Sequence, residues 1–121
     1  MSLAVLATHL ASANADQVRW KLLWEFLEEY RWDPAESRIE LLIDQPESTG
    51  DERWDALLAA LAEHLLAQED LAPPAWVEPR VLSRAWFPAE LAIHRADALV
   101  WAPAAFRKHG VYLSVHDLAA A

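Results

Sequence analysis

STGDERWDALLAALAEHLLAQED, residues 48–70, is the stretch that decides the fold. Its large apolar residues recur at helical spacing and share one stripe of a helix: Trp54, Leu57, Leu58, Leu61, Leu65 and Leu66. The residues between them are mostly Ala, Leu and Glu, which are strong helix formers. Thr49 or Asp51 can cap the first turn, and Pro73-Pro74 prevents continuation beyond the end. We therefore predict a central helix at about 51–70, whose apolar face other segments must cover.

The composition favours helices in the rest of the chain as well. Of the 121 residues 55% are hydrophobic, seven are Trp and only two are Gly. A sheet built from tight turns needs more Gly than this, and the absence of Cys excludes disulfides and thiolate metal sites. We predict an all-α fold with a single domain over residues 1–121, a compact irregular bundle of five to seven helices around the central helix.

Three helices are predicted before the central one, at residues 2–12, 15–32 and 35–44. Asn14 or Asp16 is expected to cap the second of them. This helix is apolar around much of its circumference, which is typical of a helix packed between neighbours. We therefore expect Trp20, Trp24 and Trp32 to belong to the core rather than to a ligand platform.

The part of the chain that follows the central helix is richer in Pro. Residues 71–79 contain three Pro and are predicted to be extended or turn-like, with Trp76 and Val77 packed into the core. Residues 80–87 can form two helical turns at most, because Pro88 follows. Three more helices are predicted, at residues 89–100 with Leu91, Ile93, Leu99 and Val100 as contacts, from Pro103 to a C-terminal cap at Gly110, and from Val115 to Ala120.

The net charge of −9 is unevenly distributed. Residues 1–79 carry 16 acids and 5 bases, a net −11, and residues 80–121 carry 3 acids and 5 bases, a net +2, which together give −9. Such an acidic chain is repelled by phosphates, so we expect no direct binding of nucleic acid. An acidic surface suits a basic partner protein, although the charge could also serve solubility alone.

The N-terminal stretch MSLAVLATHLASANA, residues 1–15, superficially resembles a signal peptide. No Lys or Arg precedes its apolar run, and His9 interrupts that run, so we do not expect a cleaved signal. No segment of the sequence approaches the roughly 18 uninterrupted apolar residues of a membrane span. We expect a cytoplasmic protein that does not associate with membranes.

No pattern in the sequence predicts a catalytic, cofactor-binding or metal site. No two of the five His lie three or four residues apart on one helix, although His109 and His116 could meet across the Gly110 turn near Asp117. The adjacent carboxylates Glu28 and Glu29 point apart on a helix, as neighbouring residues do. We expect a protein that is not an enzyme and has no cofactor. The alternatives are a small hydrolase or transferase that uses buried carboxylates, and a helical accessory subunit.

A recognition role has more support, because the C-terminal part combines cations with aromatic residues. Arg and aromatic side chains together are typical of interface hot spots. The candidate partner-binding residues are Arg84, Trp86, Phe87, Arg95, Trp101, Phe106, Arg107 and Lys108. The alternative is that these aromatic residues are core and the cations form a solvated edge. The opposite charges of the two parts also permit a head-to-tail homo-oligomer.

Four segments in this order resemble a domain of bacterial toxin–antitoxin-like loci: TGDERWDALLAALAEHLLAQ (49–68), PAWVE (74–78), AWFPAEL (85–91) and RADALVWAPAAFRKHGVYLSVHDL (95–118). In that family the domain often follows an Xre-type helix-turn-helix domain and is encoded beside a nucleotidyltransferase-like protein. The resemblance covers about residues 49–118 and is weaker in the N-terminal helices.

The resemblance implies an antitoxin-like role, with no catalytic residues to transfer, and a nucleotidyltransferase-like toxin as the expected partner. This chain departs from the family pattern, because a helix-turn-helix domain would need further residues at the N-terminus and the first 48 residues are acidic and rich in Trp. The expectation is that either the DNA-binding half is absent or autoregulation belongs to another protein. An acidic chain that binds a basic toxin surface agrees with both the charge and the resemblance.

Overall fold

The computed structural model describes residues 1–88 and 92–120, which form eight helical segments, and the all-α prediction is confirmed. α3 (Ala35–Arg38) and α4 (Glu40–Ile43) are separated only by Ile39, whose dihedral angles are helical (φ −59°, ψ −41°). Counted as one, they make seven helices in the described part, within the predicted range. The chain divides into two compact units, Met1–Asp51 and Glu52–Ala120. The single domain over residues 1–121 stays a prediction.

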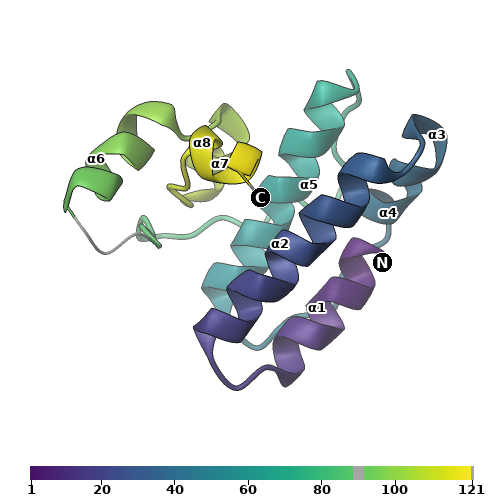
Figure 1. Cartoon of the computed structure of the whole chain (residues 1–121), viewed down its shortest axis with the longest axis horizontal. Coiled ribbons are helices and arrows are strands. Elements are labelled where there is room, and N and C mark those ends of the chain that lie inside the picture. The colour runs from purple at the N-terminus through teal and green to yellow at the C-terminus, as the bar shows by residue number, and fades with distance from the viewer. Residues whose placement is uncertain (89–91, 121) are drawn as a thin grey trace. The chain divides into compact units, whose positions relative to one another are not determined.

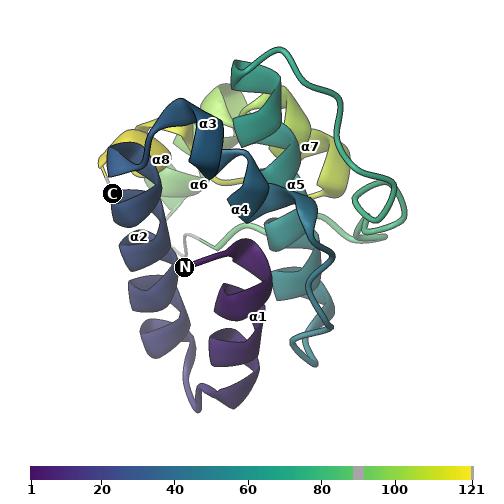
Figure 2. The same cartoon turned by 90° about the vertical axis from the view of Figure 1, so that its right-hand side faces the viewer.

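The first unit begins with a helical hairpin. α1 (Leu3–Ser12) and α2 (Asp16–Trp32) run side by side in opposite directions, as both views show (Figures 1 and 2). The Ser2 hydroxyl caps α1 by accepting a hydrogen bond from the Val5 amide at 3.1 Å. α2 starts after Ala15 without a side-chain cap, so the predicted cap by Asn14 or Asp16 is wrong. Asp16 is the first residue of α2 and pairs with Arg19 at 2.7 Å instead.

The tryptophans of α2 do not form the core of this unit, contrary to the prediction. The helix buries one stripe at spacing i, i+3, i+4 and i+7, made of Leu23, Phe26, Leu27 and Tyr30. Trp20 and Trp24 are only half-buried, and Trp32 is 82% exposed. Because the four buried residues already occupy the inward face, the tryptophans lie on the flank and on the outer side of the helix.

The second unit begins with α5 (Glu52–Gln68), and all six residues of its predicted apolar stripe are buried. The helix ends before the Pro pair because Asp70 adopts a left-handed conformation (φ 58°). The amide of Leu71 donates to the Leu66 carbonyl and the amide of Asp70 to the Ala67 carbonyl, at 3.0 and 3.1 Å. These two hydrogen bonds form a Schellman motif, which terminates α5 without help from Pro.

α7 (Ala104–His109) packs against α5, and Gly110 caps it with φ 82°, as predicted. Trp76 and Val77 are buried, as predicted. Residues 80–87, in contrast, are not helical. Trp86 forms an isolated parallel bridge with Val111, since its amide donates to the Gly110 carbonyl and its carbonyl accepts from the Tyr112 amide, each at 2.8 Å. This pairing competes with helix formation for the same backbone groups.

α6 (Ala92–Trp101) and α8 (Val115–Ala120) contact each other at the end of the unit (Figure 1). The predicted inward contacts of α6 are wrong: Ile93, Leu99 and Val100 are exposed, and Leu91 lies outside the described residues. α8 has its predicted bounds, and the Ser114 hydroxyl accepts a hydrogen bond from the His116 amide at its start. None of the helices in residues 1–88 and 92–120 has both the length and the apolarity needed to cross a bilayer.

Candidate functional site

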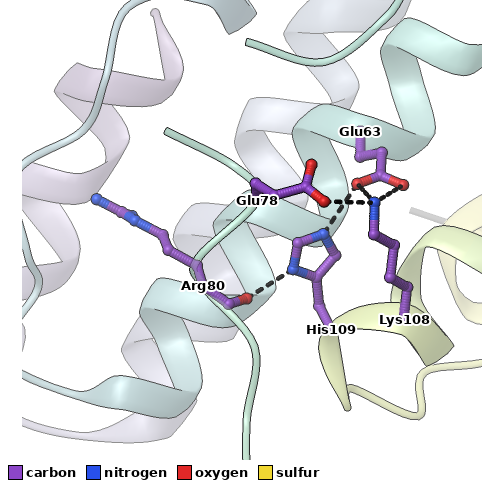
Figure 3. Close-up of polar contacts among 5 residues, drawn as sticks. All are labelled: Glu63, Glu78, Arg80, Lys108 and His109. Atoms are coloured by element: carbon purple, nitrogen blue, oxygen red, sulfur yellow. Dashed lines mark hydrogen bonds and ion pairs between the residues drawn. The ribbon is translucent and has the colours of Figure 1, made fainter. Parts of the chain in front are cut away.

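A group of polar side chains in the second unit surrounds His109, and we call it the His109 cluster: Glu63, Glu78, Arg80, Lys108 and His109 (Figure 3). α5 provides Glu63, and the last turn of α7 provides Lys108 and His109. The His109 side chain is completely buried. Its Nδ1 lies 2.6 Å from the Arg80 carbonyl oxygen, and its Nε2 lies 3.0 Å from Oε1 of Glu63.

Glu63 is the carboxylate that both Lys108 and His109 contact. Lys108 Nζ lies 3.2 Å from its Oε1 and 3.4 Å from its Oε2, and a further carboxylate oxygen, that of Glu78, lies 3.9 Å from the same Nζ (Figure 3). Burial would raise the pKa of Glu63. The hydrogen bonds from His109 and Lys108, with their positive charges, outweigh burial and lower this pKa below its ordinary value of 4.5. The carboxylate is therefore held ionised.

A His–carboxylate pair is a familiar feature of catalytic sites, but this one is closed. Both ring nitrogens of His109 face an oxygen acceptor, the Arg80 carbonyl on one side and the Glu63 carboxylate on the other. A general base must reach its substrate within hydrogen-bond distance, and no ring nitrogen of this buried residue is left for that purpose. The arrangement ties α5, α7 and the segment that contains Arg80 together, so we interpret it as a structural clamp.

The neighbouring His64 of α5 is only half-buried, and burial lowers its pKa. Its ring meets Phe106 edge-on, with the centroids 5.7 Å apart, and its Nε2 lies 3.4 Å from the Gln68 side-chain nitrogen. The neutral ring thus extends the apolar contact between α5 and α7.

The hypothesis that His109 and His116 meet near Asp117 is wrong. His109 belongs to the cluster above, whereas His116 Nδ1 lies 3.6 Å from an Asp97 oxygen and its ring lies against Trp101, 5.4 Å between centroids. In the part of the chain that the structure describes, no three His, Asp or Glu side chains are gathered where they could hold a metal ion.

The structure gives the predicted partner-binding aromatics different environments. Phe106 is completely buried. Trp86 is half-buried and meets Trp54 edge-on, with the ring centroids 5.6 Å apart. Phe87 stacks on Tyr112 at 4.7 Å, and Trp101 is exposed. Core packing therefore accounts for Phe106 and much of Trp86, while Trp101 stays available to a partner.

The predicted cations fall into two groups, those with structural contacts and those that are mainly exposed. Arg107 donates hydrogen bonds to the carbonyl groups of Leu99, Val100 and Ala102, which lie at the end of α6, so it serves as a cap. Lys108 belongs to the His109 cluster. Arg95 is exposed and lies over the Phe87 ring at 5.0 Å, and Arg84 is exposed as well. Of the four predicted cations, Arg84 and Arg95 therefore have the weakest structural roles and remain candidates for partner binding.

Sequence reasoning missed the outer surface of α6. Its large apolar residues are exposed: Ile93 to 76%, Val100 to 62%, Leu99 to 53% and Trp101 to 52%. Ile93 and Val100 lie seven residues apart and share one face of the helix, whereas Ala98 is buried. Among the side chains of residues 93–101, all of them described, the buried one is the small Ala98, and no local sequence pattern marks this orientation.

No known family model matches the chain, and no curated protein or solved structure shows significant similarity to it. The resemblance of residues 49–118 to a domain of toxin–antitoxin-like loci therefore stays a prediction. The residues that carry the resemblance belong almost entirely to the second unit, Glu52–Ala120. Any function has to be argued from the surfaces and side chains described above.

Proposed function

We propose that the chain is a non-enzymatic protein-binding domain that neutralises or regulates a partner protein in the cytoplasm, as an antitoxin does. The observation that carries the proposal is the exposed α6 surface, which consists of Ile93, Leu99, Val100 and Trp101. These bulky apolar residues all lie within a helix of ten residues. An exposed apolar patch of this kind is typical of a surface that a protein partner covers.

The chemistry around this surface suits a protein partner. Trp101 and the exposed Arg95 are residue types that contribute most to interface affinity. The net charge of −9 favours a partner with a basic surface and disfavours nucleic acid. The resemblance of residues 49–118 suggests a nucleotidyltransferase-like toxin as that partner. An enzyme remains the weaker alternative, because its best candidate, the Glu63–His109 pair, is enclosed.

The test is co-expression with the product of the neighbouring gene. The wild-type chain should relieve the growth arrest that this product causes, and the two proteins should co-purify as a stable complex. The double variant Ile93→Ser/Val100→Ser should lose co-purification while its circular dichroism and unfolding transition stay unchanged, because both side chains are exposed.

A matched control replaces two other exposed apolar residues of the same unit, Leu71→Ser/Val81→Ser. It replaces one six-carbon aliphatic residue and one Val, as the α6 variant does, at positions exposed to 42% and 47%, and it should co-purify like the wild type. If the wild-type chain neither relieves growth arrest nor forms a complex, the proposal is wrong. If the control loses the complex as fully as the α6 variant does, α6 is not the binding surface.

A further inference from the structure

The half-buried tryptophans of α2 line a groove in the first unit. Its volume is about 620 Å³, and its lining residues all come from α2: Gln17, Trp20, Lys21, Trp24, Glu25, Glu28 and Glu29. The Trp20 and Trp24 rings are stacked one helical turn apart, with centroids separated by 5.7 Å and ring planes inclined by 28°. The lining extends over twelve residue steps, about 18 Å of helix at 1.5 Å per residue. This length matches a segment of a partner chain rather than a small ion.

The rim of the groove is negatively charged. Glu25, Glu28 and Glu29 are exposed, and Lys21 is the single cation among the lining residues. Three carboxylates and one ammonium group leave a local charge of −2. The terminal ammonium of Met1 lies 3.2 Å from Glu29 and offsets part of this charge at one end. Glu25 and Glu28 therefore dominate the potential beside Trp24.

We infer that this α2 groove binds the Lys or Arg side chains of a basic protein segment. A guanidinium or ammonium group placed on an indole is attracted by the ring, and carboxylates beside the ring strengthen this attraction. Arg fits best, because its planar group can stack on Trp24 and donate to a carboxylate at the same time. The inference rests on the proposed function in taking the natural occupant to be part of the partner protein.

The charge of the rim argues against other occupants. Nucleic acid bases stack on tryptophan, but the phosphates that accompany them would approach Glu25, Glu28 and Glu29. A second copy of the chain that placed its α2 on this α2 would bring the same carboxylates together. A basic segment satisfies both the aromatic surface and the negative rim.

The binding experiment uses a fluorescein-labelled peptide of nine arginines and measures fluorescence anisotropy with the full-length chain. The wild-type chain should bind this peptide, and a labelled peptide of nine glutamates should not bind. Trp24→Leu should weaken binding by about fivefold to tenfold, as loss of a cation–π contact does. Trp24→Phe retains an aromatic face, and we expect most of the affinity to be preserved. It therefore controls for a folding defect in the Leu variant.

Two charge variants distinguish the groove from the overall acidity. Glu25→Gln/Glu28→Gln should weaken binding by about tenfold, because both carboxylates lie beside the aromatic pair. Glu36→Gln/Glu47→Gln removes the same charge from exposed positions of the same unit outside the groove lining, and we expect less than about a twofold change. Equal weakening by the two pairs would show that binding follows net charge, and the inference would be wrong.

Other outcomes also decide the matter. Unchanged binding by Trp24→Leu would overturn the inference, and so would a concentration-dependent dimer in sedimentation that this variant abolishes. The peptide experiment is independent of the co-expression test. If the peptide fails to bind but the neighbouring gene's product co-purifies, only the groove is wrong. If the peptide binds and no complex with that product forms, only the proposed function is wrong.

Discussion

α2 and α5 are the same length, 17 residues each, but they differ in how many of their residues are buried. α5 buries ten of its residues, whereas α2 buries four. α2 was predicted to be packed between neighbours, and α5 was predicted to carry one apolar face that other segments cover. α2 contains three Trp and α5 only one, yet α5 is the buried helix. The comparison shows that the amount of aromatic surface in a helix does not determine which helix becomes core.

The neighbours of each apolar residue explain the difference. In α5 the residues beside the Leu stripe are largely Ala, and these small residues are buried as well: Ala56, Ala59, Ala60 and Ala62. Small residues permit close approach of another segment on several sides. In α2 three charged residues, Glu25, Glu28 and Glu29, lie between Trp24 and Trp32 in the sequence, and their charges require water. The strip that contains them therefore remains at the surface although it contains large rings.

The sharpest way to break this comparison is to remove one Trp from each helix. Trp54 of α5 is completely buried, so Trp54→Ala should lower the free energy of unfolding by about 3–5 kcal/mol. Trp32→Ala in α2 should change it by less than about 0.5 kcal/mol, because the side chain is mostly exposed. Urea unfolding followed by circular dichroism measures both. Similar losses for the two variants would contradict the assignment of core and surface.

A second prediction concerns Glu63, a carboxylate that is partly buried on α5, whereas Glu25, Glu28 and Glu29 of α2 are exposed. Glu63→Gln should destabilise the chain by about 2 kcal/mol at neutral pH, because the buried His109 loses its ionised partner. Lys108→Gln is the control. Its ammonium group is partly exposed, so we expect a loss below about 1 kcal/mol.

The pH dependence of the same pair of variants sharpens this point. The pKa of Glu63 is lower in the folded chain than its ordinary value of 4.5. Its stabilising contribution is therefore complete above about pH 4.5 and disappears as the pH falls through the folded-state pKa. We expect the difference in stability between the wild type and Glu63→Gln to shrink in that acid range, as urea unfolding at several pH values would measure. A difference that stays constant there would show that Glu63 is not held ionised.

A smaller effect is expected at the Gly residues that adjoin the helices. Gly110 ends α7, which packs against α5, with φ 82°, and an added Cβ would lie 3.1 Å from Cβ of Leu82. Gly110→Ala should cost about 1–2 kcal/mol through backbone strain and this contact. Gly50 has a similar φ of 87° but no atom within 4 Å of an added Cβ. Gly50→Ala should cost about 1 kcal/mol, from strain alone, and thermal unfolding would resolve the difference.

The smallest predicted effect is a gain in stability at the uncapped start of α2. Ala15 has the extended conformation of an N-cap (φ −148°, ψ 150°) but no side chain that can accept a hydrogen bond. Ala15→Ser should stabilise the chain by about 0.5–1 kcal/mol. Ala13→Ser, two residues earlier, is the control and should be neutral, because Ala13 follows α1 rather than starting a helix. Equal gains at both positions would indicate a cause other than capping.

The candidate site was less predictable than the helices. The residues of the His109 cluster are separated by up to 46 positions in the chain, and no local spacing joins Glu63 to His109. Two of the predicted binding residues have structural roles that depend on tertiary packing. Phe106 is buried in the unit where α7 packs on α5, and Arg107 caps the end of α6. The α2 groove was missed because an aromatic helix was expected to be buried.

Local patterns in the sequence were sufficient for the all-α class, for the buried stripe of α5, for the end of α7 at Gly110 and for the bounds of α8. These features depend on neighbours within one or two helical turns. The packing of distant segments decided which side of α2 and α6 faces solvent, why residues 80–87 form a bridge rather than a helix, and how His109 is enclosed. Burial depends on what covers a side chain, and that information lies far away along the chain.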